Sequence, residues 1–280
     1  MTRCALVTGG SKNIGGGIAA ALAEHGYDVA ITYATDREGA ENTKKLIEAA
    51  GRRCFVYEAH LENAEEPARV VRRANTDLGR LDAVVCNAGR DMRNSVLTAT
   101  ADDYDFLFKN TVRNYYLCAG AAARIMVRDK TAGSIILVTS VRAKTAHPDD
   151  FLYGGFKAAM ERACQSMALD LSEFNIRVNC LAPGAVWKNN PVNPFTRESI
   201  PLHRVGTPRD MGEAAVFLAG ESSNYITGTT LLVDGGLSLP GLLESPSAVP
   251  WKTERWAKMR YEKAMALLDD EIRGDEDNGH

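Results

Sequence analysis

Tyr153 and Lys157 are four residues apart in a segment with a helical pattern, so their side chains project from one face of one helix. A free phenol has a pKa of about 10, too high for efficient proton exchange at neutral pH. A neighbouring ammonium favours the phenolate and lowers that pKa towards the working range. Ser140 ends an earlier apolar segment, and its hydroxyl can hold a reacting oxygen beside the phenol. These residue types predict proton transfer to a carbonyl oxygen or from an alcohol.

A glycine-rich turn, residues 8–17, follows the first apolar segment and opens a helix-length segment. Glycines permit positive φ and let the main chain approach a pyrophosphate, which then lies at the helix N-terminus. A turn of this kind between a strand and a helix predicts a dinucleotide site. The residues expected to contact the dinucleotide there are Gly9, Ser11, Lys12, Asn13, Ile14 and Gly15.

Short apolar segments alternate with helix-length segments through most of the chain. This alternation predicts βαβ crossovers and a parallel sheet covered by helices on both faces, a doubly wound Rossmann-type α/β domain over residues 1–237. The expected strands are residues 4–8, 29–33, 54–58, 83–86, 134–140, 177–181 and 230–233. The expected helices include residues 18–25, 38–50, 67–78, 104–126 and 153–174.

The chain of 280 residues suits one domain, and its composition, 45% hydrophobic and 25% charged, is typical of a globular enzyme. The net charge of −3 argues against nucleic acid as the main partner. Six cysteines lie singly, which predicts neither a zinc site nor a disulfide framework. No leader pattern and no membrane-length apolar segment is found, so we expect a cytoplasmic protein without a membrane partner.

Two regions break the alternation. Residues 184–207 are longer than a usual connection, which is typical of a lid or binding loop. Residues 238–280 form an extension that the sheet does not require, with an amphipathic helix expected over 251–272 and disorder over the acidic residues 274–280. The extension either packs on the body or a neighbouring subunit or helps to close the active site.

These motifs resemble the classical short-chain dehydrogenase/reductase family over about residues 3–237, including its 3-oxoacyl-acyl carrier protein reductase and sugar dehydrogenase-like members. The turn is similar to the family's TGxxxGxG, with Thr8, Gly9 and Gly15 matching. Asn13 replaces the middle glycine, and asparagine tolerates the left-handed region better than most residues. Further matches in family order are the NAG motif Asn87-Ala88-Gly89, Asn110, Pro183-Gly184, and residues 226–228 and 233–236.

The resemblance implies roles for these residues. Tyr153 would be the general acid/base, Lys157 would lower its pKa and bind the nicotinamide ribose, and Ser140 would orient the carbonyl. Asn110 would hold a proton-relay water. The NAG motif would support the sheet centre, and Pro183, Gly184 and Val186 would lie near the nicotinamide. A homo-oligomer, dimer or tetramer, is expected through the helices at 104–126 and 153–174.

The choice between NADP and NAD depends on the residues after the second and third strands. A carboxylate at the end of the second strand would bind the ribose 2′-hydroxyl of NAD, but Tyr33 stands there. Lys12 and Arg37 could pair with a 2′-phosphate, whereas Asp36 argues for NAD. We therefore expect NADP, with NAD as the alternative. His60-Leu61 replaces the family's usual aspartate near the adenine, and a neutral imidazole can still accept a hydrogen bond there.

Charged residues follow the strands that end near the nicotinamide, and they suggest a polar substrate. An arginine fork can bind a carboxylate through two hydrogen bonds. The substrate is therefore expected to be polar and anionic in some of its candidate classes, which are a sugar acid, a hydroxy or keto acid, and an acyl thioester. The charged side chains could equally face solvent or a subunit contact. The proposed substrate residues are Arg90, Arg142, His147 and Lys188, with Arg93 and Phe151 nearby.

A carbonyl reductase or alcohol dehydrogenase is the leading interpretation. Another enzyme on the same scaffold, an enoyl reductase or an epimerase, is the second. Enoyl reductases of this fold tend to place six residues between tyrosine and lysine, and the three found here speak against that activity. A non-catalytic dinucleotide sensor is the third, but it would be expected to lose Tyr153 or Lys157.

Overall fold

The computed structural model describes residues 2–187 and 200–239, together with residues 262 and 265. The chain divides into two compact units, residues 1–191 with 205–234 and residues 192–204 with 235–280. The expected boundary between residues 237 and 238 stays a prediction, because most of the extension, including residues 251–261 and 274–280, lies outside the described residues. Within the described part, no helix is both long enough and apolar enough to cross a membrane.

The first unit contains a seven-stranded parallel sheet in the order β3-β2-β1-β4-β5-β6-β7. This topology confirms the doubly wound Rossmann-type fold. The strand order reverses between β1 and β4, which is where open α/β sheets bind their ligands. The strands are β1 (Arg3–Val7), β2 (Tyr27–Tyr33), β3 (Cys54–Glu58), β4 (Ala83–Cys86), β5 (Ser134–Val138), β6 (Arg177–Pro183) and β7 (Thr230–Val233).

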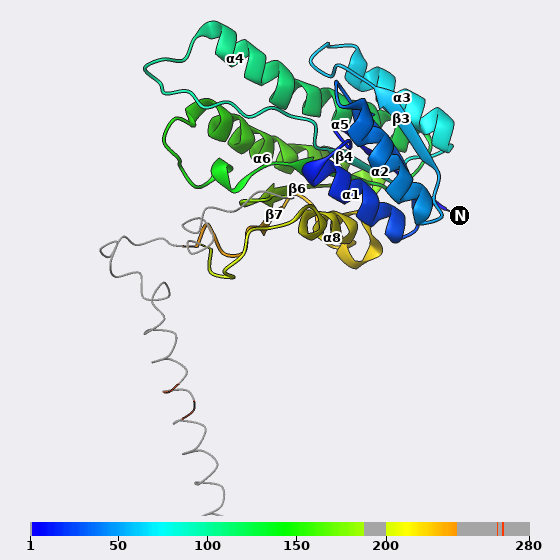
Figure 1. The fold of residues 1–280 in the computed structure, drawn as a ribbon. Helices are drawn as coiled ribbons and strands as arrows, with labels where there is room; N and C mark the ends of the chain where they lie inside the picture. Colours follow the sequence, from blue (N-terminus) through cyan, green and yellow to red (C-terminus); the bar gives the residue numbers. More distant parts are fainter. Residues whose placement is uncertain (1, 188–199, 240–261, 263–264, 266–280) are drawn as a thin grey trace, which may run out of the picture. The chain divides into compact units, whose positions relative to one another are not determined.

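Helices cover both faces of this sheet (Figure 1). α1 (Asn13–Glu24), α2 (Arg37–Ala49) and α8 (Pro208–Ala219) pack on one face, and α3 (Glu66–Leu78), α5 (Asn114–Arg128) and α6 (Phe151–Leu171) pack on the other. α4 (Ala101–Phe108) is joined to α5 by the π-helical turn η1 (Lys109–Arg113). Short 3-10 turns are η2 (Val141–Ala143), η3 (Ser172–Phe174) and η4 (Glu221–Ser223).

The expected start of the first helix was wrong, because α1 begins at Asn13 rather than at residue 18. Its early glycines lower helix propensity, but they allow close packing between helices. A Cβ on Gly17 would lie 2.3 Å from the carbonyl oxygen of Pro208 in α8. The expected single helix over 104–126 was also wrong, since η1 interrupts it.

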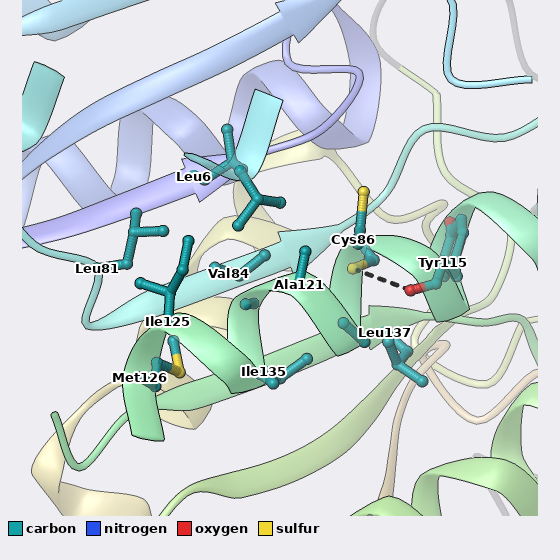
Figure 2. Close-up of a cluster of buried hydrophobic side chains, with 14 of the residues drawn as sticks. Leu6, Leu81, Val84, Cys86, Tyr115, Ala121, Ile125, Met126, Ile135 and Leu137 are labelled. Atoms are coloured by element: carbon teal, nitrogen blue, oxygen red, sulfur yellow. Dashed lines mark hydrogen bonds between the residues drawn. The ribbon is translucent and has the colours of Figure 1, made fainter. Parts of the chain in front are cut away.

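The side chains of β1 alternate between two buried clusters. Leu6 lies in the cluster beneath α3, α5 and α6, whereas Ala5 and Val7 lie beneath α1, α2 and α8. Figure 2 shows part of the first cluster, where α5 packs Ala121, Ile125 and Met126 against Ile135 and Leu137 of β5. Each fully buried aliphatic side chain of this kind contributes about 1.5–3 kcal/mol. Packing on both faces of the sheet keeps the carboxyl ends of the strands, where the site residues follow, in fixed positions.

Candidate active site

A cavity of about 750 Å³ opens at the carboxyl ends of β1, β2 and β4. Much of its lining comes from residues that the sequence assigned to the dinucleotide: Gly9, Ser11, Lys12, Asn13, Ile14, Gly15, Tyr33, His60, Leu61, Asn87, Ala88 and Gly89. Arg90 and Asn110 line it as well. Other predicted site residues lie outside that lining, namely Arg37, Ser140, Tyr153, Lys157, Pro183, Gly184 and Val186, together with the substrate residues Arg142 and His147.

Hydrogen bonds of Thr8 and Asn87 hold the glycine-rich turn in position. The Thr8 hydroxyl accepts hydrogen bonds from the main-chain N–H groups of Asn87 and Ala88, at 2.9 and 3.0 Å. The Asn87 amide donates in return to the carbonyl oxygens of Thr8 and Gly9, at 2.9 and 3.1 Å. The NAG motif therefore holds the turn in place.

Two glycines of the turn are required by its geometry. Gly9 has φ of +65°, and a Cβ on Gly15 would lie only 2.1 Å from the Gly9 carbonyl oxygen. Asn13 has φ of 48°, which confirms the left-handed conformation that its residue type tolerates. The main chain at the start of α1 lines the cavity, and such a helix N-terminus fits the pyrophosphate of NAD(P).

Opposite charges meet at the far end of the cavity. Lys12 Nζ lies 3.0 Å from Asp36 Oδ2, and the Lys12 side chain is 62% exposed. Asp36 also caps α2 by accepting a 3.0 Å hydrogen bond from Gly39 N, and its bond with Lys12 holds the pKa of that carboxyl below its usual value. The Tyr33 hydroxyl donates to Glu58 Oε2 at 3.3 Å, and His60 Nδ1 lies 3.2 Å from Glu62 Oε1.

Ser140, Tyr153 and Lys157 come together where β5 meets the start of α6. Ser140 lies two residues beyond the last residue of β5, so the expected strand over 134–140 was slightly too long. Its hydroxyl caps η2 by accepting a 3.2 Å hydrogen bond from Arg142 N. Lys157 is 4% exposed, and its Nζ donates a 2.8 Å hydrogen bond to the Val138 carbonyl. That Nζ lies 5.5 Å from the centroid of the Tyr153 ring.

Burial dominates the protonation of both groups. It raises the pKa of Tyr153 to about 12, although the Arg142 charge and a hydrogen bond with Ser140 act in the opposite direction. Burial lowers the pKa of Lys157 to about 7. Burial thus disfavours the charged forms of both groups, the phenolate of Tyr153 and the ammonium of Lys157.

Asn110 lies in the π-helical turn η1, a kind of element frequent at functional sites. Its side-chain amide donates to the Phe106 carbonyl at 2.9 Å. Its own carbonyl oxygen accepts a 2.8 Å hydrogen bond from Asn114 Nδ2, which also donates to the Ala88 carbonyl at 3.1 Å. Sequence reasoning missed Asn114, a 3% exposed residue that ties η1 to the NAG segment. The sequence feature that could have indicated Asn114 is its position four residues after Asn110, on the same helix face.

The residues after β6 pack against the end of β7 and the segment that precedes α8. Gly184 N donates to the Val233 carbonyl at 3.0 Å, and a Cβ on Gly184 would lie 2.6 Å from that of Asp234. Val186 forms a bridge with Gly206. Pro183 is the last residue of β6, the strand adjacent to β5, so these residues follow the strand next to the one that leads to Ser140.

The predicted substrate residues have different surroundings. Arg90 is exposed and lines the large cavity. His147 lies with its Nδ1 3.1 Å from Arg93 Nη1 and faces a separate hollow of about 450 Å³. Arg142 is paired with two carboxylates, Asp150 and Asp91, an arrangement that does not support its binding a substrate anion. Lys188 lies outside the described residues.

Comparison with known proteins gives the family. A family model described as enoyl-(acyl carrier protein) reductase matches residues 9–238. The solved structure of a short-chain dehydrogenase/reductase from Serratia marcescens BCRC 10948 has 31% identity to this chain and a TM-score of 0.79; the match covers 84% of this chain and 98% of that one. The chain belongs to the short-chain dehydrogenase/reductase family, whose members use NAD(P).

Two further relatives have named activities. The 3-oxoacyl-[acyl-carrier-protein] reductase FabG of Staphylococcus aureus is 33% identical over 243 residues, 85% of this chain and 98% of that protein. Acetoin dehydrogenase from Enterobacter cloacae has 34% identity and a TM-score of 0.82, covering 88% of this chain and 99% of its own. This protein is accordingly an oxidoreductase that acts on alcohol or carbonyl groups.

Proposed function

We propose that this protein catalyses the NADP-dependent interconversion of a ketone and a secondary alcohol in a polar small molecule. The observation that carries the proposal is the grouping of Ser140, Tyr153 and Lys157 beyond the carboxyl end of β5, with the glycine cradle two strands away in the same sheet. The same grouping speaks against a non-catalytic sensor.

In the reductive direction, Tyr153 donates its phenolic proton to the carbonyl oxygen, which Ser140 holds by a hydrogen bond. The reduced nicotinamide, when bound, supplies the hydride that adds to the carbonyl carbon. Lys157 binds the nicotinamide ribose and, when charged, favours the phenolate left on Tyr153. The carbonyl oxygen of Asn110 is the acceptor that would hold a water for return of the proton.

NADP is proposed as the preferred cofactor for two reasons. Lys12 lines the cavity, and the last residue of β2, where NAD-binding proteins carry a carboxylate, is Tyr33. Arg37, in the first turn of α2, adds a second cation near the end of β2. The Lys12–Asp36 pair weakens this preference, because Asp36 would repel a 2′-phosphate. NAD remains the alternative that the cofactor measurement decides.

For the substrate, the relatives suggest a small hydroxyketone or a 3-oxoacyl thioester. The anionic classes proposed from the sequence, a sugar acid or a hydroxy or keto acid, depend mainly on Arg90, which is exposed and lines the cavity. Arg142 adds little to them because two carboxylates already bind its guanidinium.

The test is nicotinamide absorbance with purified protein and NADPH or NADH. The panel contains acetoin, butane-2,3-dione, an acetoacetyl thioester, a keto acid, a sugar acid and an enoyl thioester, and Tyr153→Phe is the control. Turnover of a ketone that Tyr153→Phe abolishes supports the proposal. Turnover of the enoyl thioester alone would replace it with an enoyl reductase, and no turnover with any ketone would contradict it.

We also propose a homo-oligomer, a tetramer or dimer, assembled through α4, α5 and α6. Large apolar side chains are exposed there, among them Tyr104 at 45%, Phe151 at 46% and Leu169 at 77%. Exposed apolar side chains mark contact surfaces where they lie side by side, as the rings of Tyr104 and Phe156 do. Light scattering gives the mass in solution, and a monomer at micromolar concentration would contradict the proposal.

A further inference from the structure

A guanidinium lies over the ring of the proposed acid/base. Arg142 Cζ is 4.6 Å from the centroid of the Tyr153 ring, and the Arg142 side chain is only 17% exposed. A cation over an aromatic face is attracted by the ring, and Arg142 is thus a second cation beside the phenol in addition to Lys157.

Two carboxylates fix that guanidinium. Arg142 Nε donates to Asp150 Oδ2 at 2.6 Å, and Nη2 donates to Asp150 Oδ1. Arg142 Nη1 donates to Asp91 Oδ2 at 3.2 Å. The Asp150 side chain is 3% exposed, whereas that of Asp91 is 60% exposed. Asp150 therefore acts as a buried, two-point clamp, and Asp91 holds the outer nitrogen.

The clamp is built into the elements that carry Ser140 and Tyr153. Asp150 is the residue before α6, one turn ahead of Tyr153, and Arg142 lies in the η2 turn that Ser140 caps. Gly154 permits the contact between them, because a Cβ there would lie 2.9 Å from the Arg142 carbonyl oxygen and 3.3 Å from Asp150 Oδ2. A displacement of the clamp would thus move the cation relative to the phenol.

The two cations differ in how they carry charge. Burial lowers the pKa of Lys157 to about 7, whereas a guanidinium stays protonated at every working pH. The charged and titratable groups around Tyr153 are Arg142 and Lys157, the carboxylates Asp91 and Asp150, and the buried phenol of Tyr115. The Arg142 charge lowers the pKa of Tyr153, and those of Asp91 and Asp150 raise it.

We propose that Arg142 is a positioning residue for the reaction, a permanent cation that Asp150 and Asp91 clamp over Tyr153 and that sets the proton affinity of its phenol. The inference rests on the proposed function of Tyr153 as acid/base. Arg142 acts through the phenol and touches neither substrate nor cofactor. Its charge does not titrate in the working range, whereas burial lowers the pKa of Lys157 to about 7.

Opposite substitutions give opposite shifts if the inference holds. Arg142→Gln removes the cation and should move the titration of Tyr153 upward, so that its phenol stays protonated at the highest pH at which the protein remains folded. Asp91→Asn removes an opposing charge from an exposed position and should move it downward by a fraction of a unit, on the order of 0.3. Arg142→Lys keeps the charge but loses the fork, so it should recover only part of the shift.

The measurement is nuclear magnetic resonance of tyrosine enriched in carbon-13 at Cζ, with Tyr153→Phe identifying the resonance. The pH profile of kcat/KM for alcohol oxidation, which needs the phenolate, should shift in the same directions. Arg142→Gln alone leaves the buried Asp150 carboxylate without its partner. The double variant Arg142→Gln/Asp150→Asn removes both charges, and its Tyr153 phenol should still titrate above that of the wild type. Arg162→Gln changes an exposed arginine of α6 that is bonded to Ser166; it is the matched control and should leave the titration of Tyr153 unchanged.

The inference is overturned if the Tyr153 resonance titrates as in the wild type in the Arg142 variants. It is overturned equally if Arg142→Gln and Asp91→Asn shift it in one direction, as general loosening of the loop would do. The resonance reports the phenol whether or not any substrate of the panel turns over. A failure of the proposed function is therefore distinguishable from a failure of this inference.

Discussion

The ammonium of Lys157 donates a 2.8 Å hydrogen bond to the main-chain carbonyl of Val138 in a fully packed region. Burial lowers the pKa of Lys157 from 10.5 to about 7, so the folded protein releases a proton that the unfolded chain keeps. Between about pH 7 and pH 10 unfolding takes up this proton, and stability rises with pH across that window. Below about pH 7 the lysine is charged in both states, and burial of its charge lowers the free energy of unfolding by the full amount.

Lys157→Met should therefore stabilise the protein while it abolishes activity. At about pH 6 we expect a gain of roughly 4 kcal/mol in the free energy of unfolding, reduced by the lost bond to Val138. At about pH 9 the gain should shrink, since the wild-type lysine is then neutral. Urea unfolding of both proteins at the two pH values measures it. An equal difference at both would show that the lysine is not titrating near neutrality.

Much of the fold follows from the sequence because strand periodicity and turn chemistry are local properties. All seven strands lie where apolar segments predicted them, and Asn13 adopts the conformation that its residue type tolerates. The start of α1 and the turn η1 could not be found in this way. The first involves the close approach of α8 to Gly17, and the second is a local change from α-helical to π-helical hydrogen bonding, so both are tertiary or geometric effects.

The surroundings of the site residues were harder to predict. The spacing of Tyr153 and Lys157 places both on one helix, but it does not show that burial lowers the pKa of the lysine. Arg142 was interpreted as a substrate residue from its position after Ser140. Its actual partner, Asp150, is eight residues away across a loop whose path the sequence does not specify. Charge pairing across loops needs the fold before it can be assigned.

Gly154 and Gly155 offer a matched pair of substitutions in α6. Gly154→Ala should cost about 1–3 kcal/mol, because its Cβ would lie 2.9 Å from the Arg142 carbonyl and push η2 away. Its kcat should fall by about tenfold as Arg142 moves off the phenol. Gly155→Ala meets no atom within 4 Å and should gain about 0.5–1 kcal/mol from helix propensity. Thermal unfolding and steady-state kinetics compare them, and equal losses in both variants would contradict the close contact.

Lys12 and Asp36 should control the choice between NADPH and NADH in opposite directions. Lys12→Ala should raise the Kd for NADPH by about tenfold and leave that for NADH nearly unchanged. Asp36→Asn keeps an α2 cap but removes a negative charge, so it should tighten NADPH binding. Fluorescence titration of both cofactors gives the constants. Lys44→Ala, which removes a lysine paired with Glu48 farther along α2, is the control. A Lys12 effect equal for both cofactors would remove the support for a 2′-phosphate contact.

Asn114 should prove as important for activity as the predicted residues that it connects. Its amide bonds two carbonyl oxygens, those of Ala88 and Asn110, in a region where it is 3% exposed. Asn114→Leu would leave both acceptors without this donor, at a cost of about 1–3 kcal/mol in the free energy of unfolding. Because these acceptors belong to the NAG segment and to η1, the cofactor Kd and kcat should both worsen. Asn75→Ala removes a 3.4 Å bond to Asp129, together with a buried amide oxygen that has no partner among the described residues, and is the control, with a cost below about 1 kcal/mol. Stability and cofactor binding of Asn114→Leu that match those of Asn75→Ala would show that the link between the two segments is dispensable.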